Sequence, residues 1–342
     1  MHRPLRLTID SSALVHNWRW LQKRAGVPAG AAIKADGYGL GAREGMQALH
    51  EAGCRDFFVS TWAEAEELGA VPDGASLVVL HGVGPDDVEA ALASTARPVL
   101  NSVEQVERWK KVGGDRHCDV MIDTGMNRLG LRTDEIASLG GLSIDTLHSH
   151  LACADEDDDL NSRQLERFRE VTGVVPAQRY SFANSAGICL GREYSFDLVR
   201  PGLALYGGIP RREAEGSIRQ VAHIEAQIVQ RRTIRAGESC GYGATFVADE
   251  DTEAAILNVG YADGYLRGFS SRGAAFAGEF ALPVLGRVSM DLIAVGCGAA
   301  PDLKEGEWIE LDYDLPTASE ASGLSQYELL TCLGSRFERR WI

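Results

Sequence analysis

The sequence predicts an α/β protein in two parts, an N-terminal (β/α)8 TIM-type barrel followed by a mainly antiparallel β domain. From residue 29 to about 207, short apolar runs alternate with amphipathic segments. This alternation is typical of parallel strands joined by right-handed helical crossovers. After about residue 218 the apolar residues recur every second position instead, which is typical of antiparallel strands. We therefore expect domains spanning residues 1–217 and 218–342.

Eight apolar runs are the expected strands of the barrel, which is the number that a closed (β/α)8 barrel needs. Several of the helical patterns between them begin with a capping residue, as at Pro85-Asp86 and Asn101-Ser102. A further helix is expected over 11–24, before the first strand. The expected strands are 29–34, 57–61, 76–81, 97–101, 118–123, 146–151, 180–183 and 197–200. The expected helices between them are 42–51, 63–70, 86–93, 103–112, 134–139 and 160–171.

The β domain is expected from strands that alternate with period two, most clearly over 223–230 and 307–311. Further strand candidates, interrupted by glycines, are 254–259 and 284–295. No long helical pattern intervenes before 325–333. The polar and charged segment 211–217 is the expected linker.

Composition excludes several classes of function. The net charge of −15 disfavours nucleic acid and anionic membranes as partners, because both reward clustered Lys and Arg. Seven scattered cysteines without a Cys-x-x-Cys pair indicate reduced thiols, neither a disulfide framework nor a thiolate metal site. No apolar run reaches the length of a membrane span, and the first ten residues contain no secretory signal. We expect a cytoplasmic protein with a small-molecule partner.

Lys34 is the first candidate functional residue, because it lies where a buried apolar run meets a glycine-rich loop. A partly desolvated ammonium has a lowered pKa, and a neutral amine forms a Schiff base with an aldehyde. The alternative is a lysine whose stem packs on the strand while its charge reaches water.

Other chemistry-bearing residues follow the remaining strands, and barrel active sites lie at the carboxyl ends of the strands. Ser185-Ala186-Gly187, at a strand-to-helix turn, offers N–H groups and a hydroxyl to a phosphate. Gly202-Leu203 follows the last strand, where barrels often bind phosphate. A Schiff-base lysine together with a phosphate cradle describes pyridoxal phosphate (PLP). The residues that converge on this end are Lys34, Tyr38, Asp123–Arg128, His148, His150, Asn184–Gly187 and Arg200–Gly202.

Metal binding is the alternative interpretation of two motifs. His148 and His150 point to the same face of a strand and could be ligands, but no third ligand occupies another strand end. We expect hydrogen-bonding histidines instead. The acidic run 155–159 lacks the spaced oxygen ligands and central glycine of a calcium loop. We expect it to be a solvated loop before the next helix, and we expect no metal.

Ordered motifs across both domains resemble the alanine racemase family, PLP enzymes with a barrel followed by a β domain. The motifs are Ala32-Ile-Lys-Ala-Asp-Gly-Tyr-Gly39, Asp123-Thr-Gly-Met-Asn-Arg-Leu-Gly130, His150-Leu-Ala-Cys-Ala-Asp-Glu156, Ala183-Asn-Ser185, Arg200-Pro-Gly-Leu-Ala-Leu-Tyr-Gly207, Gly241-Tyr-Gly-Ala-Thr-Phe246, Gly260-Tyr-Ala-Asp-Gly264 and Gly286-Arg-Val-Ser-Met-Asp291. The first of these is similar to the cofactor-lysine signature of the family.

The resemblance implies PLP as cofactor and two catalytic bases on opposite faces of the substrate Cα. Lys34 would carry PLP and be one base, and Tyr242 from the partner subunit of a head-to-tail homodimer would be the other. His150 and Arg200 would lower the pKa of Tyr242, and Arg200 would face the pyridine nitrogen and disfavour its protonation. The implied cofactor-binding residues are Lys34, Tyr38, His150, Asn184, Ser185, Arg200, Gly202 and Leu203. The implied substrate-binding residues are Arg128 and Met290, with Asp291 and Tyr261 at the entrance.

Two positions depart from the family pattern. Many members have a carbamylated lysine two residues before the Asp-Thr-Gly motif, where this chain has Met121. Arg128 must then be held by another acceptor or by an anion such as chloride, or be more mobile. Some members have a tyrosine near the C-terminus where this chain has Ser335. Both changes alter the residues around the substrate, so the resemblance supports racemisation more strongly than it supports a strict preference for alanine.

The motifs leave other functions open. A racemase of serine, lysine or broad specificity fits the same motifs. A decarboxylase of the same fold would place an acid against the ring nitrogen, and Arg200 argues against it. A non-catalytic PLP-binding protein would resemble the barrel alone, and the domain with Tyr242 argues against that. Cell-wall precursor supply through D-alanine biosynthesis and D-alanine catabolism are both consistent with the sequence.

Overall fold

The computed structural model describes residues 2–342, whose contacts separate into two compact units. One unit spans Leu14–Arg219, and the other joins Gln220–Ile342 with the N-terminal segment up to Ala13. The N-terminal segment was expected in the barrel domain. It belongs to the second unit because strand β1 (Leu5–Ile9) pairs antiparallel with β9 (Ala222–Ile234) and parallel with β17 (Glu338–Trp341).

The first unit is a closed parallel barrel. Among the described residues, β2 to β8 form a seven-stranded parallel sheet in sequence order. Leu198 bridges to Ser181 and Val199 to Ala29, so this segment takes the eighth position and closes the ring. The strands are β2 (Ala31–Ala32), β3 (Asp56–Val59), β4 (Ser76–Val79), β5 (Arg97–Leu100), β6 (Cys118–Met121), β7 (Ile144–His148) and β8 (Arg179–Ser181). The predicted barrel is confirmed.

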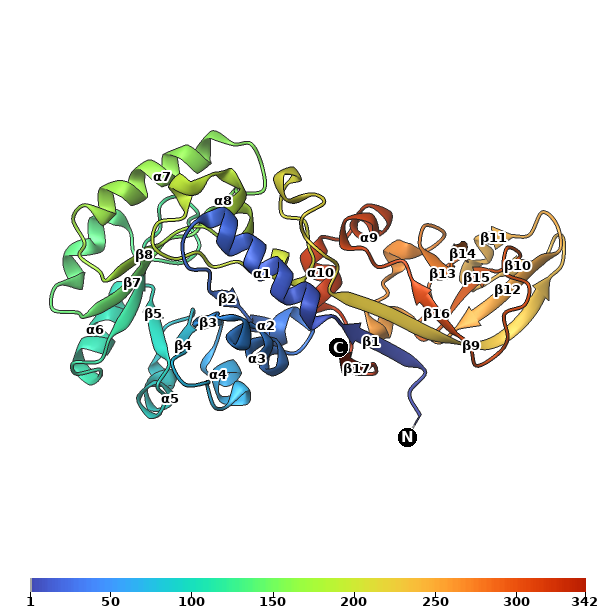
Figure 1. Cartoon of the computed structure of the whole chain (residues 1–342), viewed down its shortest axis with the longest axis horizontal. Coiled ribbons are helices and arrows are strands. Elements are labelled where there is room, and N and C mark those ends of the chain that lie inside the picture. Colours follow the sequence, from blue (N-terminus) through green and yellow to red (C-terminus); the bar gives the residue numbers. More distant parts are fainter. Residues whose placement is uncertain (1) are drawn as a thin grey trace. The chain divides into compact units, whose positions relative to one another are not determined.

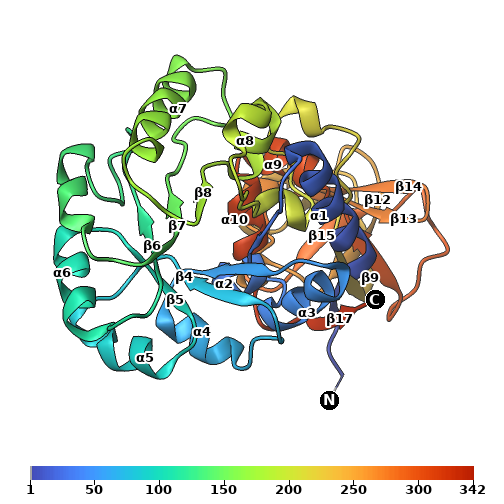
Figure 2. The same cartoon turned by 60° about the vertical axis from the view of Figure 1, so that its left-hand side comes forward.

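Helices lie outside this ring of strands, and α4 to α7 follow one another around it (Figure 2). The predicted helical patterns correspond to them closely, because each has an apolar face to pack on the strands. The helices of this unit are α1 (Ser11–Ala25, of which the residues from Leu14 belong here), α2 (Lys34–Tyr38), α3 (Ala42–Ala52), α4 (Trp62–Leu68), α5 (Val88–Ala93), α6 (Val103–Val112), α7 (Asp159–Thr172) and α8 (Ser185–Leu190). The expected helix over 134–139 is a 3-10 segment, Thr133–Leu139.

Buried apolar side chains from β3, β4, β5, β6 and the eighth position pack together inside the ring. They are Phe58, Val78, Val99, Met121 and Leu198. Met121 is 7% exposed, so it is part of the barrel core and offers no polar group to the carboxyl end of its strand.

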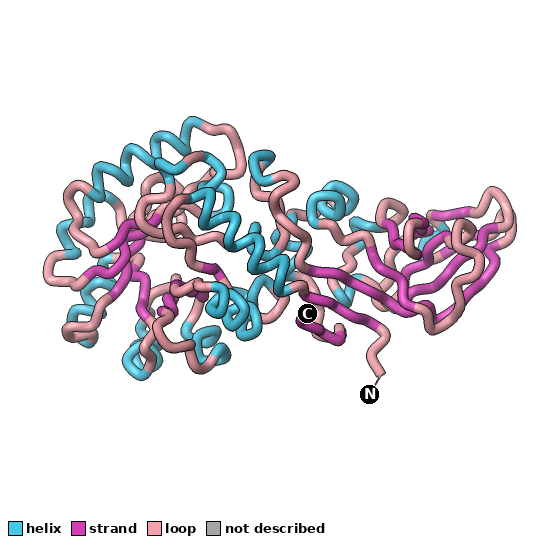
Figure 3. Tube along the Cα trace, in the orientation of Figure 1, coloured by secondary structure: helices cyan, strands magenta, loops and turns pink. Residues whose placement is uncertain are grey.

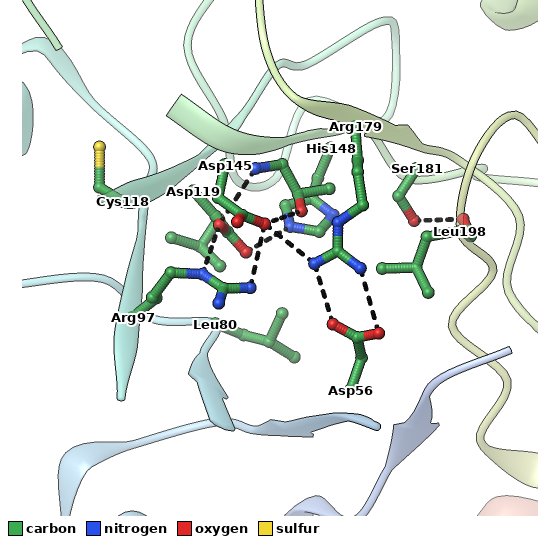
Figure 4. A network of polar contacts seen from close by, with 12 residues as sticks. Asp56, Leu80, Arg97, Cys118, Asp119, Asp145, His148, Arg179, Ser181 and Leu198 are labelled. Carbon is green, nitrogen blue, oxygen red and sulfur yellow. Dashed lines mark hydrogen bonds and ion pairs between the residues drawn. The ribbon is translucent and has the colours of Figure 1, made fainter. Parts of the chain in front are cut away.

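The amino end of the strands contains a network of paired charges (Figure 4). Arg179 contacts Asp56 and Asp145 at 2.9 Å each, and Arg97 contacts Asp145 at 3.2 Å and Asp119 at 3.1 Å. Each of the five is the first or second residue of its strand. The network therefore joins β3, β5, β6, β7 and β8 at this end.

The second unit is mainly antiparallel, as predicted, and Figure 3 shows strands through most of it. The order β12-β15-β14-β13-β16-β9 closes on itself because β9 also pairs with β12, and β1 and β17 extend the sheet beyond β9. Its remaining strands are β10 (Ser239–Cys240), β11 (Phe246–Val247), β12 (Thr252–Leu257), β13 (Ala274–Ala277), β14 (Phe280–Leu285), β15 (Ile293–Gly296) and β16 (Trp308–Leu311), labelled in Figure 1.

Two helices follow β16 in this unit. The second, α10 (Gln326–Thr331), lies within the predicted range 325–333. The first, α9 (Leu315–Ser322), was not expected, because its small and polar residues give little helical periodicity. It begins after Asp314, whose carboxylate accepts the Thr317 N–H at 3.3 Å. Across residues 2–342, no helix combines the length and the apolar character that a membrane span needs.

Candidate functional site

Lys34 begins a turn of unusual backbone conformation. The expected first strand, 29–34, ends at Ala32, and the four residues from Ala35 to Tyr38 have φ between 51° and 61°. The Gly37 N–H donates to the Ile33 carbonyl at 2.8 Å, so the turn is a left-handed helical one. Such a conformation costs about 1–2 kcal/mol for each residue that has a Cβ. Strain of this size persists where neighbouring contacts impose it.

The half-buried Lys34 ammonium lies in a positive environment. Burial lowers its pKa, the charges of Arg128 and Arg200 lower it further, and only Glu64 opposes them. Burial and the same cations lower the pKa of His150 to about 3. His150 is therefore neutral near pH 7, which corrects the expectation that it supplies positive charge. The positive field at this end comes from the lysine and the two arginines.

Arg200 is buried and fixed by two hydrogen bonds. Its Nη2 donates to the Ser149 carbonyl at 2.7 Å, and its Nη1 donates to the Ser181 hydroxyl. Burial lowers its pKa to about 10, against the opposing charge of Asp119. The guanidinium thus remains charged at neutral pH and cannot easily turn away from this end of the barrel.

The two segments predicted to hold a phosphate are in direct contact. The Ser185 hydroxyl accepts hydrogen bonds from the Gly202 N–H at 3.0 Å and the Ala204 N–H at 3.2 Å. The Asn184 side chain accepts the Gly187 N–H at 2.8 Å and so caps α8. The barrel therefore brings the residues after its seventh and eighth strands together, as the sequence suggested.

Tyr38 lies against the same segment. A Cβ added at Gly202 would be 2.1 Å from the Tyr38 hydroxyl oxygen, so only glycine permits this approach. The Tyr38 ring stacks on Tyr206 with 4.8 Å between the ring centroids. Leu203 is buried and begins the 3-10 segment Leu203–Tyr206. The hydroxyl of Tyr38 is thus placed beside the backbone of Gly202 and the Ser185 contact.

Arg128 lies in a tightly wound loop after β6. Asp123 Oδ1 accepts the N–H groups of Gly125, Met126 and Asn127 at 2.8, 2.9 and 3.1 Å. Arg128 itself is exposed, and its side chain makes no ion pair with any described residue of the barrel unit. The loop therefore presents a guanidinium that its own unit leaves without a counter-charge.

Gln164, on α7, is a residue that the sequence reasoning missed. Its side chain is fully buried, and Nε2 donates to the His150 carbonyl at 3.0 Å and to Thr124 Oγ1 at 3.2 Å. Its Oε1 accepts the Ala152 N–H at 2.9 Å. The amide thus joins the loops that follow β6 and β7. The sequence feature that could have identified Gln164 is its place on the apolar face of an amphipathic helix, because a buried amide needs hydrogen-bond partners.

The motifs considered for metals have other partners. His148 Nε2 contacts Asp119 Oδ2 at 3.0 Å, and burial lowers the His148 pKa to about 4. In the acidic run, Asp158 caps α7 through the Leu160 N–H at 2.6 Å, so the run is the expected loop before a helix. Residues 2–342 contain no cluster of three or more His, Cys, Asp or Glu that could hold a metal ion.

The second unit gathers three of its four candidates into adjoining loops. The Ala262 N–H donates to the Met290 carbonyl at 3.0 Å, next to Tyr261. Arg336 binds Asp291 at 2.7 Å and the buried Asp263 at 2.6 and 2.7 Å. The fourth candidate, Tyr242, is 70% exposed in a 3-10 segment between glycines of positive φ, Gly241 and Gly243. An exposed loop was expected there.

Comparison with known proteins finds a match for each of the two parts of the chain. The family model for the N-terminal domain of alanine racemase matches residues 9–210, and the model for its C-terminal domain matches residues 221–341. Both models describe domains of a PLP-dependent isomerase. The chain belongs to the alanine racemase family.

Individual relatives support the family assignment. The catabolic alanine racemase of Agrobacterium fabrum is 40% identical, over 98% of this chain and 92% of its own. The biosynthetic alanine racemase of the same organism is 39% identical, over 99% and 94%. The crystal structure of alanine racemase from Bartonella henselae, with covalently bound pyridoxal phosphate, has a TM-score of 0.92 and 36% identity over the full length of both chains.

Proposed function

We propose that this protein uses PLP to interconvert L- and D-alanine through two bases, Lys34 and Tyr242 of a partner subunit. The isomerase class, the cofactor and the substrate follow from membership of the family. The observation that supports the assignment of residues is the position of Lys34, half-buried beside Arg128 and Arg200 at the carboxyl end of the barrel. Strand ends at this face are where barrel enzymes place their chemistry.

The residues present fit PLP. Ser185, the backbone at Gly202 and Leu203, and the Tyr38 hydroxyl form a small cradle that a single added Cβ would fill. Asn184 caps the first turn of α8, which begins with Ser185. When bound, PLP supplies an electron-withdrawing system that acidifies the proton on the substrate Cα. Arg200, fixed and charged, would face the ring nitrogen.

Lys34 would move the proton on one face of the substrate Cα. A base at neutral pH must be free of its own proton, and burial together with two neighbouring cations lowers the pKa of Lys34 toward that state. Tyr242 would act on the opposite face through its hydroxyl oxygen. A tyrosine has an ordinary pKa of about 10, so Arg200 would supply the positive field that His150, being neutral, does not.

Substrate binding would use the unpaired guanidinium of Arg128 and the Met290 backbone for the carboxylate, with Asp291 and Tyr261 at the entrance. Arg128 is available for this role because Met121, which stands where many family members have a carbamylated lysine, is an apolar core residue and cannot pair with it. His150 would contribute to the site as a neutral hydrogen-bonding group. A homodimer is part of the proposal because Tyr242 must come from another copy. A cytoplasmic location also belongs to it, and the seven free cysteines support that location.

A racemase of broader specificity is the second candidate function, favoured by Met121 and Ser335. Met121 lacks the charge of the carbamylated lysine that many family members have, and Ser335 lacks the ring of the tyrosine that some members have. The family uses both positions around the substrate. The decarboxylase alternative is disfavoured because the residue that would face the ring nitrogen is Arg200 and not an acid. The biosynthetic and catabolic relatives of one organism are about equally similar to this chain, so the likeness favours neither role.

The test is a chiral assay of the purified, PLP-loaded protein against a panel of L- and D-amino acids. Alanine should be racemised fastest in both directions, and serine or lysine at comparable rates would establish the broad alternative. Tyr242→Phe should slow the two directions unequally, because it removes one base only. Full activity of that variant in both directions would overturn the two-base assignment.

A further inference from the structure

Glu64, in the first turn of α4, has a carboxylate with two separate tasks. The helix is capped by Thr61, whose hydroxyl accepts the Glu64 N–H at 3.2 Å. Glu64 Oε2 accepts the Ser60 N–H at 2.5 Å, which resembles the reciprocal bond of a capping box. Glu64 Oε1 accepts the Ala35 N–H at 2.9 Å. Capping needs one oxygen, and the other is bonded to the residue that follows Lys34.

The turn that Glu64 contacts is strained and lacks tight packing on one side. Its residues are in the left-handed region, which is unfavourable for Ala35 and Asp36. A cavity of about 250 Å³ is lined by Ile33, Asp36 and Glu64, among other residues. Apolar packing therefore does not support the turn on this side. Hydrogen bonds do so instead, from the Ala35 N–H to Glu64 and from the Ala42 N–H to Asp36 at 2.9 Å.

Glu64 also affects Lys34 through its charge. Arg128, from the loop after β6, and Arg200, after the eighth strand, both disfavour the Lys34 ammonium. His150, after β7, is neutral near pH 7. Glu64 is the one acid among the described residues whose charge counters these cations at Lys34. Removing it would shift the protonation of Lys34 toward the free amine.

We propose that Glu64 is a positioning residue for Lys34, which holds the left-handed turn through Ala35 and balances the two arginine charges. The inference rests on the proposed role of Lys34 as the PLP-binding lysine. Local helix capping alone would not require the bond to Ala35. A residue with only a capping role would also leave the protonation of Lys34 unchanged.

The test uses the full-length apoprotein and follows the rate at which the visible cofactor band appears after PLP is added, as a function of pH. Glu64→Gln removes the charge and leaves an acceptor for only one of the two N–H groups. The midpoint of its pH profile should move to lower pH by about half a unit or more, because the ammonium loses its counter-charge. Its equilibrium affinity for PLP should fall about tenfold, the size expected for one lost hydrogen bond to a charged group.

Glu64→Asp tests the charge of the side chain separately from its length. It keeps the carboxylate but shortens the side chain, so the midpoint should stay near that of the native protein while PLP affinity falls. Glu66→Gln, on the exposed side of the same helix, is the matched control and should leave both quantities unchanged. A Glu64→Gln midpoint equal to that of Glu66→Gln would overturn the electrostatic part of the proposal. If Glu64→Asp binds PLP as tightly as the native protein does, the positioning part of the proposal is wrong. This test remains available even if Glu64→Gln fails to fold.

Lys34→Ala distinguishes this inference from the proposed function. If Lys34→Ala still forms the visible band, the assignment of Lys34 is wrong and Glu64 has no such role. If Lys34→Ala abolishes the band while both Glu64 variants behave as the native protein does, the proposed function stands and the inference about Glu64 fails.

Discussion

The two ends of the barrel differ in whether their cationic side chains are paired with acidic ones. At the amino end, Arg97 and Arg179 meet three aspartates, and the contacts between them are 2.9 to 3.2 Å long (Figure 4). At the carboxyl end, the charges of Arg128 and Arg200 act on Lys34, and Glu64 is the acid that opposes them there. Paired charges contribute to the stability of the fold. Unpaired cations are available for a ligand that brings its own negative charge.

The carboxyl end is therefore expected to be completed by its ligand. Burying a cation without a partner is unfavourable, and an anion that binds only the folded state offsets that cost. PLP brings a phosphate and the amino acid brings a carboxylate, which matches the two kinds of anion that the cradle and Arg128 are suited to bind. The amino end has no such need, because its aspartates already neutralise its arginines.

The largest effect is expected from breaking the chemistry at the carboxyl end. Lys34→Ala should abolish the visible cofactor band and lower racemisation about a thousandfold or more, because it removes both a base and the cofactor attachment. A chiral assay and an absorption spectrum of the same sample measure the two losses. Thermal unfolding of the apoprotein is the control and should change little, since Lys34 is not part of the paired network. Racemisation near the native rate would contradict the role of Lys34.

The next effect is expected from breaking the amino end. Asp119 is buried, and its loss leaves Arg97 and His148 without this partner. Asp119→Ala should lower the free energy of unfolding by about 3–5 kcal/mol, the usual cost of removing one member of a buried ion pair. Urea unfolding measures it.

The matched control for Asp119→Ala is Asp134→Ala, which removes an exposed partner of Arg132. Its stability should stay close to that of the native protein, because solvent screens exposed pairs. The folded fraction of Asp119→Ala should keep its racemase activity within about threefold, since the network lies at the opposite end of the strands from Lys34. A large loss of activity with native stability would reverse the proposed division between the two ends.

The barrel strands were predictable because parallel strands, buried on both faces, appear as short apolar runs. The candidates at their carboxyl ends followed from the fold rule alone. The left-handed turn after Lys34 was not predictable, because Ala35 and Asp36 normally avoid that conformation. Nor was the pairing of Leu5–Ile9 with the second unit, which joins residues more than two hundred positions apart. Long-range pairing and tertiary strain leave little local trace in a sequence.

A smaller effect is expected from filling the phosphate-type cradle. Gly202→Ala would put a Cβ at 2.1 Å from the Tyr38 hydroxyl oxygen, so the backbone or the tyrosine must move. We expect PLP affinity to fall about ten- to a hundredfold, the range that overpacking by about 1–3 kcal/mol produces. Equilibrium titration of the apoprotein with PLP measures it. Gly140→Ala is the control, because its Cβ would have no atom nearer than 3.9 Å. Equal affinities in the two variants would refute the cradle.

The smallest effect is a dependence of stability on pH that arises at His148, the last residue of β7, which contacts Asp119 of the amino-end network. Burial lowers the pKa of His148 to about 4, below the value of about 6.5 in an unfolded chain. The unfolded state therefore binds a proton that the folded state refuses, and this contribution to stability is complete above about pH 6.5 and falls toward pH 4. At about pH 5 the loss should be roughly 2 kcal/mol.

His148→Gln isolates this contribution, because glutamine retains a donor for Asp119 and does not titrate. We expect urea unfolding at about pH 7.5 and pH 5 to show a drop in stability that is smaller in the variant by roughly 2 kcal/mol. His150 remains in both proteins, so its own titration cancels in the difference. An equal drop in both proteins would mean that His148 is protonated in the folded state, and the Asp119–His148 contact would then be a charged pair of the same kind as the others in the network.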